Sequence, residues 1–315
     1  MSTISSLLFS VVICTYNRAE ILSEAIKTAC EQEFDSEKFE VIVVDNNSSD
    51  STSEIIEKYK LMYPNLKSVI EPKQGLSNAR NLGWRIARGL YVAYIDDDSK
   101  VSSDWLSKAS RVVEKYNPAV FGGPILPFYR DRPPSWFKDS YVIHKPYEDT
   151  RELNRNDADV IFGGNMIWRR DILDSLNGFK PELGMNGNKP GYGEETQLLR
   201  QLSANKLNEK IYYIPELFAY HLVQVYKYKM IHIVKASFRA GRDFYHFEPK
   251  KNHSISRVQI LRKGLRIIRI FGLDMVKKTI TRDKTEYPYF RGYFYKQSTK
   301  YIRQLGRIYE QLKYY

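Results

Sequence analysis

The stretch LYVAYIDDD, residues 90–98, joins an apolar run directly to three consecutive aspartates. The run alternates and carries β-branched and aromatic residues, which predicts a buried strand. Carboxylates at the end of such a strand need a positive partner, because burying unpaired charge costs several kcal/mol. A divalent cation, Mg²⁺ or Mn²⁺, would be such a partner, since both prefer oxygen ligands. The alternative is an acidic turn that caps a helix beginning near residue 105.

Working outward, the preceding part of the chain repeats the pattern of an apolar strand followed by polar residues. Residues 9–15 are a continuous apolar run, and we predict a second strand over residues 39–44 and a short third one over residues 66–70. Helical patterns lie between them, over residues 20–31, 52–59 and 78–88. Apolar strands that alternate with helices predict a mostly parallel sheet covered on both faces. Ligands bind such sheets beyond the carboxyl ends of the strands, so we expect the polar clusters around Asn17, Asp45 and Asp97 to converge on one crevice.

After Asp98 the pattern is mixed. A helix over residues 105–116, the end of a strand at 119–122 and a proline-rich stretch at 124–134 follow each other. We then predict a strand over 159–168 interrupted by Gly163-Gly164, a glycine-rich loop leading to a helix over 196–202, and a last strand at 211–214. From Lys227 onward, long basic amphipathic helices are expected.

Composition and charge divide the chain in two. Its 315 residues are 43% hydrophobic and 27% charged, which is typical of a soluble protein with a sizeable core. We expect neither a transmembrane span nor a signal peptide, and two cysteines, Cys14 and Cys30, favour the reducing cytoplasm. Residues 221–315 hold 22 Lys and Arg against 6 Asp and Glu, whereas residues 1–220 are mildly acidic, with 27 against 31. A charged partner is therefore expected for the C-terminal part alone.

An ordered set of motifs gives the chain a resemblance to a known family. The motifs are Thr15-Tyr16-Asn17-Arg18, Asp45-Asn46-Asn47-Ser48-Ser49-Asp50, Gly75-Leu76-Ser77-Asn78-Ala79-Arg80-Asn81, Asp96-Asp97-Asp98, Gly163-Gly164-Asn165-Met166 with Arg169-Arg170, Gly178-Phe179, and Gly193-Glu194-Glu195-Thr196. Together they resemble the inverting family-2 glycosyltransferases of bacterial polysaccharide synthesis, over roughly residues 7–225. The resemblance implies the GT-A fold, an α/β, Rossmann-like, mostly parallel mixed sheet with helices on both faces. It implies a catalytic domain over residues 1–225, followed by a basic helical extension over 226–315.

The resemblance also implies which residues bind the nucleotide. They are Thr15, Tyr16, Arg18, Asp45, Arg80, Asp96 and Asp97. Asp45 would accept hydrogen bonds from the base or ribose, Tyr16 would stack on the base, and Asp96 would face the ribose. For Asp45 the alternative is a helix-capping role, and for Arg80 it is a surface salt bridge.

For the metal and the sugar, the resemblance implies four further positions. Asp98 would ligate a divalent metal, Mn²⁺ or Mg²⁺, that bridges the diphosphate, and His221 would complete the metal shell. A histidine that is simply packed or exposed is the alternative. Gly164 and Asn165 would let the backbone approach the donor sugar or acceptor closely, the alternative being a β-bulge.

Glu195 is the candidate catalytic base, and Glu194 is the second candidate. Relatives carry an acidic pair here, usually Glu-Asp, and Glu194-Glu195 lengthens the second side chain by one methylene. Two carboxylates that merely favour a helix N-terminus are the alternative. The loop over residues 183–193 is either a lid that orders on donor binding or an ordinary surface loop.

The basic amphipathic pattern of the C-terminal extension predicts that this part of the chain binds an anionic membrane surface. Residues 255–280 read as a basic amphipathic helix, a type that lies on anionic membrane surfaces. A helical cap on the catalytic domain or an oligomer contact is the alternative, and no nucleic acid is expected.

These features predict a metal-dependent enzyme. It would move a sugar from a nucleotide donor, a UDP-hexose, to a hydroxyl of a glycan or lipid-linked saccharide at the cytoplasmic face of the membrane. A nucleotidyltransferase is the alternative enzyme, but it should carry a glycine-rich, basic phosphate loop after its first strand, and residues 15–18 are not one. A non-catalytic, membrane-associated protein that binds sugar nucleotides is the other alternative.

Overall fold

The protein, seen here as a computed structural model, is described over residues 7–154, 160–187, 191, 193–205, 208–247 and 256–314. It divides into two compact units, one of Met1–Phe128 with Ile143–Leu222 and one of Tyr129–Val142 with Val223–Tyr315. The second unit includes residues 129–142 because Trp136 and Phe137 pack with Val223 and Ile233 in one hydrophobic cluster. The expected division into residues 1–225 and 226–315 stays a prediction.

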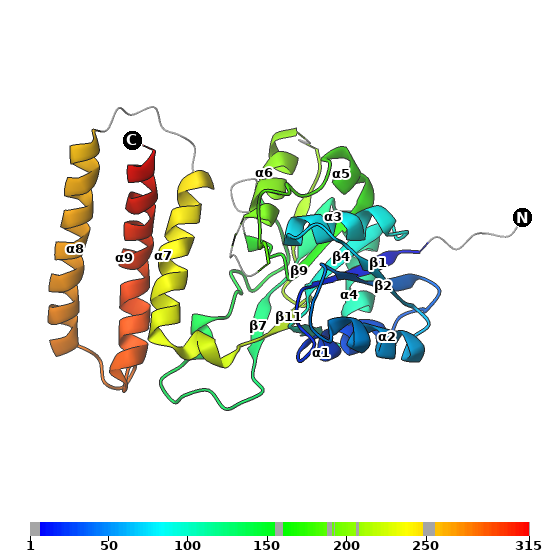
Figure 1. Cartoon of the computed structure of the whole chain (residues 1–315), viewed down its shortest axis with the longest axis horizontal. Coiled ribbons are helices and arrows are strands. Elements are labelled where there is room, and N and C mark those ends of the chain that lie inside the picture. Colours follow the sequence, from blue (N-terminus) through cyan, green and yellow to red (C-terminus); the bar gives the residue numbers. More distant parts are fainter. Residues whose placement is uncertain are drawn as a thin grey trace, which may run out of the picture. The chain divides into compact units, whose positions relative to one another are not determined.

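An eight-stranded sheet, with strand order β3-β2-β1-β4-β9-β6-β10-β8, is the centre of the first unit (Figure 1). Its strands are β1 (Phe9–Thr15), β2 (Phe39–Asp45), β3 (Leu66–Ile70), β4 (Tyr91–Asp96), β6 (Val120–Gly122), β8 (Arg151–Glu152), β9 (Asn165–Arg169) and β10 (Ile211–Tyr213). The four strands β1 to β4 are parallel to one another. Strand β9 runs antiparallel between β4 and β6, so the predicted mostly parallel mixed sheet is confirmed.

Helices cover both faces of this sheet because the strand side chains alternate. Val11 and Ile13 of β1 belong to one buried cluster, and Val12 between them belongs to another. The first cluster includes residues of α1 (Leu22–Cys30), α2 (Thr52–Met62) and α4 (Trp105–Tyr116). The second includes residues of α3 (Leu76–Ile86), α5 (Arg170–Ser175) and α6 (Glu194–Asn205). Both faces are thus buried, as the continuous apolar runs predicted.

Two predicted elements differ from the structure. Strand β9 begins at Asn165 and follows Gly163 and Gly164, which lie in a turn, so the glycines precede the strand and do not interrupt it. Residue 159, where the strand was expected to begin, lies outside the described residues. Helix α6 begins at Glu194, two residues earlier than expected, and therefore includes the acidic pair.

A second, three-stranded sheet was not anticipated. Its order is β5-β11-β7, with β5 (Ser99–Val101), β7 (Ile125–Phe128) and β11 (Ala219–Leu222). Strand β11 is antiparallel to β5 and parallel to β7. Strands of three or four residues are too short to give a periodic signal.

Three long helices make up most of the second unit: α7 (Met230–Phe247), α8 (Arg257–Ile280) and α9 (Phe290–Lys313) (Figure 1). Short 3₁₀ segments, η1 (Asp139–Tyr141) and η3 (Val225–Tyr228), accompany them. Helices α7 and α9 approach closely, since a Cβ on Gly306 would lie 2.0 Å from the carbonyl oxygen of Phe238. The predicted basic helices are confirmed. In the described part of the chain, no helix combines the length and apolarity needed to cross a membrane.

Candidate active site

The predicted polar clusters share one edge of the large sheet. In the β1–β2 pairing Thr15 lies opposite Asp45, and in the β1–β4 pairing Cys14 lies opposite Asp96. Because β9 is antiparallel, its first residue, Asn165, lies opposite Ile95 at the same edge. The register therefore brings the ends of three parallel strands and the start of β9 together.

Hydrogen bonds join the loop that follows β1 to the loop that follows β2. Asn17 donates its backbone N–H to Ser48 Oγ at 2.9 Å, and its side-chain oxygen accepts from Ser49 N–H at 2.8 Å. Asn17 and Asn47 have positive φ angles of 52° and 62°, a conformation that asparagine tolerates better than most residues. Asp45 Oδ1 accepts from Ser48 N–H at 2.9 Å. This bond shapes the loop and does not cap α2, whose N-cap, at residue 51, has no side-chain cap bond.

Asn46 is a buried loop residue whose role was not anticipated. Its side-chain oxygen accepts from Gly75 N–H at 2.8 Å, and its amide nitrogen donates to the carbonyls of Glu71 and Lys73 at 3.0 and 2.8 Å. It thereby ties the end of β2 to the segment that leads into α3. The position of Asn46 in the polar cluster that follows the predicted strand over residues 39–44 is a weak sequence signal for this role.

Asp96, Asp98 and His221 form a compact group of metal-type ligands. Each offers one ligand atom, and these atoms all lie within 4.8 Å of one another. His221 Nε2 lies 3.1 Å from Asp98 Oδ1 and 4.0 Å from Asp96 Oδ2. The second sheet explains this proximity, because His221 pairs with Ser99 across β11 and β5, and Leu222 N–H donates to Asp98 O at 2.9 Å.

The raised pKa values of Asp96 and of the neighbouring Asp97 indicate an excess of negative charge that a bound cation would offset. Burial raises the pKa of Asp96, against the lowering effect of Arg80 and His221. Burial and the neighbouring Asp98 raise the pKa of Asp97 to about 7, although Arg18 opposes the shift. Arg18 Nε lies 3.9 Å from Asp97 Oδ2, too far to neutralise it fully. Two carboxylates and one imidazole are a donor set that suits Mn²⁺ and, less closely, Mg²⁺.

Arg80 links this acidic group to the start of α6. Its Nη1 lies 2.7 Å from Glu194 Oε1, and its Nη2 lies 3.7 Å from Asp96 Oδ1. The guanidinium also lies over the rings of Tyr94 and Phe179, at 5.9 and 5.6 Å from their centroids. Arg80 is only 3% exposed, so the alternative of a surface salt bridge is wrong. The two rings were missed because nothing in the sequence relates them to Arg80.

The glycine pair before β9 accommodates these same side chains. A Cβ on Gly163 would lie 2.5 Å from Arg80 Nη2, and one on Gly164 would lie 2.3 Å from Asp96 Oδ2. Such distances are too short for non-bonded atoms, so the structure explains both glycines by the close packing of Arg80 and Asp96. A bulge is not the reason for them, because the strand begins only after the pair.

The side chain of Asn165 has a structural role. It is fully buried, and its amide nitrogen donates to the carbonyls of Leu217 and Pro124 at 2.7 and 3.2 Å. Its oxygen lies 3.3 Å from the indole nitrogen of Trp105, which donates to it. The backbone N–H of Asn165 donates to Phe162 O at 3.0 Å. The expected approach of the backbone at Gly164 and Asn165 to a sugar stays a prediction.

Glu194 and Glu195 differ in their surroundings, although they are adjacent at the N-terminus of α6. Glu194 is 5% exposed and is held by Arg80. Glu195 is half-buried, and the Oε2 atoms of both glutamates are buried without a hydrogen-bond partner. Burial and the charge of Glu194 raise the pKa of Glu195 to about 8, against the lowering effect of Arg80. A carboxyl group with a raised pKa has the kind of perturbation that general acids and bases show.

The loop before α6 is described in part. Residues 188–190 and 192 of the expected lid lie outside the described residues. The preceding part contacts α3, where Leu76 N–H donates to Met185 O at 2.7 Å and Ser77 Oγ donates to Leu183 O at 2.7 Å. Gly187 lies near Tyr16, since a Cβ on it would be 3.8 Å from a ring carbon of that tyrosine.

Residues 10–176 match the model of the family described as glycosyl transferase family 2. This match covers more than half of the chain, and the protein belongs to this family of glycosyltransferases. The sequence is 29% identical over 180 residues to the glycosyltransferase AglE of Haloferax volcanii, covering 56% of this chain and 58% of AglE. It is 28% identical over 185 residues to the poly(ribitol-phosphate) beta-N-acetylglucosaminyltransferase TarS of Staphylococcus aureus, covering 54% of this chain and 32% of TarS. The matches thus span about half of this chain and a smaller or similar share of these relatives.

Solved structures show the same fold. A crystal structure of S. aureus TarS 1–349 in complex with UDP-GlcNAc matches with a TM-score of 0.56 and 19% identity, covering 97% of this chain and 92% of that one. The mannosyltransferase PcManGT of Pyrobaculum calidifontis, in complex with GDP-Man and Mn²⁺, matches with a TM-score of 0.63 and 15% identity, covering 96% and 86%. At these identities the likeness shows the GT-A fold alone.

Proposed function

We propose that the protein is a metal-dependent, inverting glycosyltransferase. It moves a hexose from a UDP-sugar to a hydroxyl of a glycan or lipid-linked saccharide in surface polysaccharide synthesis, at the cytoplasmic face of the membrane. One observation carries the proposal: Arg80 connects the Asp96, Asp98 and His221 group to the acidic pair at the start of α6. This connection supports a metal-bound diphosphate and a catalytic base that act in one site. The TarS complex with UDP-GlcNAc and the PcManGT complex with GDP-Man and Mn²⁺ support a donor and a metal of these classes.

The reaction needs one proton acceptor and a way to carry the charge of the leaving group. Glu195 takes the proton of the acceptor hydroxyl, whose oxygen bonds to the anomeric carbon as the bond to the diphosphate breaks. Glu194 stays ionised in its ion pair with Arg80, which does not leave it available as a base. The negative charge of Glu194 contributes to the raised pKa of Glu195. Asp98 and His221, the expected ligands, would hold a metal ion together with Asp96, which was expected to face the ribose. The metal would supply Lewis-acid stabilisation of the charge on the departing diphosphate.

Two substitutions test the assignment. We expect Glu195→Gln to lower kcat about 10²- to 10⁴-fold while donor binding stays near normal, because a general base acts on the chemical step. Asp98→Ala should weaken metal-dependent donor binding as well. Transfer is measured as release of the nucleoside diphosphate across a panel of nucleotide sugars with Mn²⁺, and donor binding by calorimetry.

Matched exchanges of exposed acids on the same unit, Glu54→Gln and Asp35→Ala, serve as controls. They should leave both quantities unchanged. If Glu195→Gln and Asp98→Ala stay folded and keep wild-type transfer, the proposed site is wrong.

A further inference from the structure

Helix α8 has two apolar faces, and α9 covers one of them. Ile260 and Ile267 are buried with Tyr301 and Ile308 of α9. A second set of aliphatic residues lies on another side of the helix, with 48% to 67% of each residue exposed. This apolar stripe consists of Val258, Leu261, Leu265, Ile268 and Val276. Their spacing of mostly three or four residues keeps them on one side of the helix.

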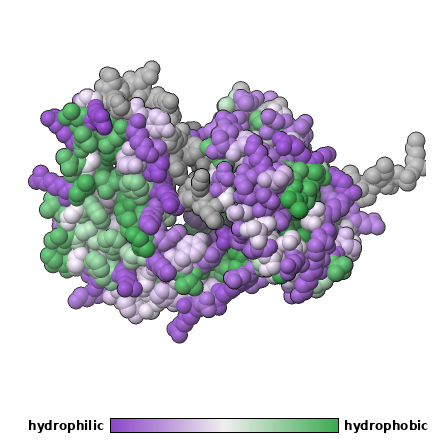
Figure 2. Space-filling view, in the orientation of Figure 1, coloured by the Kyte–Doolittle hydropathy of each residue, from purple (hydrophilic) through white to green (hydrophobic). Residues whose placement is uncertain are grey.

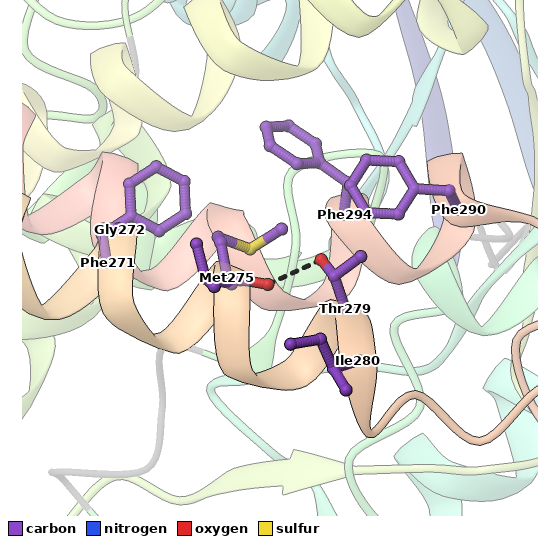
Figure 3. Close-up of a pocket in the computed structure, with 8 residues that line it drawn as sticks. Phe271, Gly272, Met275, Thr279, Ile280, Phe290 and Phe294 are labelled. Carbon is purple, nitrogen blue, oxygen red and sulfur yellow. Dashed lines mark hydrogen bonds between the residues drawn. The ribbon is translucent and has the colours of Figure 1, made fainter.

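An apolar groove continues the stripe at the C-terminal end of α8. It has a volume of about 540 Å³ and is lined on the α8 side by residues that include Phe271, Met275 and Val276. Phe290 and Phe294 of α9 form the opposite wall, as Figure 3 shows. Thr279 also lines it, but its hydroxyl donates to the carbonyl of Met275 at 2.6 Å and is already satisfied (Figure 3). Figure 2 shows hydrophobic residues gathered over α8 and α9 on the face in view.

Basic residues flank the apolar stripe. Arg262, Arg266, Arg269 and Lys277 are exposed and lie next to it on the helix surface. Helix α8 carries seven Lys and Arg and a single acidic residue, Asp274. Asp274 accepts a hydrogen bond from Tyr301 of α9 at 2.8 Å, which directs it toward the covered side. The exposed side of α8 therefore combines apolar area with a positive field.

We propose that this face of α8, with the adjoining groove, docks on an anionic lipid bilayer. The apolar stripe would enter the interface between headgroups and acyl chains, and the arginines would contact lipid phosphates. Charge argues against a second copy of the chain as the occupant, because pairing these faces would bring two basic stripes together. The inference goes beyond sugar transfer and uses none of the residues assigned to it.

The test is flotation of the full-length protein with vesicles. We expect binding to phosphatidylglycerol vesicles, weak binding to phosphatidylcholine vesicles, and loss of binding as salt is raised. The triple variant Arg262→Gln, Arg266→Gln, Arg269→Gln should bind anionic vesicles roughly 100-fold more weakly, since each basic residue near the surface contributes about a fivefold factor. Leu265→Gln with Ile268→Gln should also weaken binding, because both residues supply apolar area.

Controls separate this proposal from general charge and from the enzymatic proposal. A triple variant of exposed lysines on the other unit, Lys27→Gln, Lys38→Gln, Lys58→Gln, removes the same charge and should keep binding. The inactive Asp98→Ala variant should bind vesicles as the wild type does. Equal binding to both vesicle types, or no effect of the α8 arginine variant, overturns the proposal. So does light scattering that finds a lipid-free dimer which Leu265→Gln dissociates, with no vesicle binding.

Discussion

Arg80 is the residue on which the candidate site depends most. Its guanidinium lies between two carboxylates, Asp96 and Glu194, and over the rings of Tyr94 and Phe179. Removing one partner of a buried ion pair leaves an uncompensated charge, which costs more than the pair contributed. Arg80 therefore has a positioning role that also maintains the folded state.

We expect Arg80→Met to destabilise the protein by about 3–5 kcal/mol, because Glu194 would stay buried without its partner. Arg85→Met, an exposed arginine on the same helix, is the matched control and should change stability by less than about 0.5 kcal/mol. Urea unfolding measures both. Equal effects of the two variants would show that the ion pair with Glu194 is not formed.

The raised pKa of Glu195 predicts how activity varies with pH. The carboxylate is the active form, so kcat/KM should rise with pH and level off above about 8, where Glu195 is ionised. Stability should change in the opposite direction. A carboxyl whose pKa is higher in the folded state stabilises the fold at low pH, and this contribution is lost as pH rises toward 8.

Glu195→Gln cannot ionise and is the control for both trends. Its stability should fall less than that of the wild type between pH 5 and pH 9. A wild-type rate profile that levels off near pH 5 would contradict the raised pKa.

At the residue scale, the sequence predicted which polar residues lie at one edge of the sheet. It did not predict which side chains contact one another there. Asp96 to Asp98 were singled out because they follow a strand, a relation that local sequence carries, whereas the acidic pair was singled out by the resemblance to the family. The bridge from Arg80 to Glu194 joins residues far apart in the chain, and a single sequence contains no signal for it. The site roles implied by the resemblance remain predictions.

At the scale of elements, long strands and helices followed from hydrophobic periodicity. Helix α4 was predicted with its observed bounds, and β1 likewise, since their patterns extend over seven residues or more. The sheet β5-β11-β7 was missed, because its strands are short and gain their order from pairing with each other. This sheet is nevertheless what carries His221 to Asp98.

Replacing either of two glycines in the second unit, Gly306 or Gly272, with alanine should change stability in opposite directions. A Cβ on Gly306 would lie 2.0 Å from the carbonyl oxygen of Phe238, so Gly306→Ala must separate α9 from α7. We expect a loss of about 1–3 kcal/mol. Nothing lies within 4 Å of a Cβ on Gly272 in α8, so Gly272→Ala should gain about 0.5–1 kcal/mol from helix propensity. Denaturation midpoints measure both changes, and a neutral Gly306→Ala would contradict the close approach of α7 and α9.

At the scale of the whole molecule, donor binding should be visible as stability. We expect UDP with Mn²⁺ to raise Tm, since a ligand at 100 times its Kd adds about 2.7 kcal/mol to a state that alone binds it. A chelator should remove this increase, and Asp98→Ala should not show it. An equal increase with UDP in the presence of chelator would argue against a metal between Asp98 and the diphosphate.

The segment Tyr129–Val142 has a consequence for any attempt to shorten the protein. The chain leaves the first unit for the second after Phe128, returns to the first at Ile143, and enters the second again after Leu222. Truncation after Leu222 would keep Trp136 and Phe137 but remove Ile233 and Tyr228, which pack with them. Two large rings would then face water, which favours aggregation. A catalytic domain truncated after Leu222 should remain monodisperse only if the segment Tyr129–Val142 is also replaced by a short polar connection.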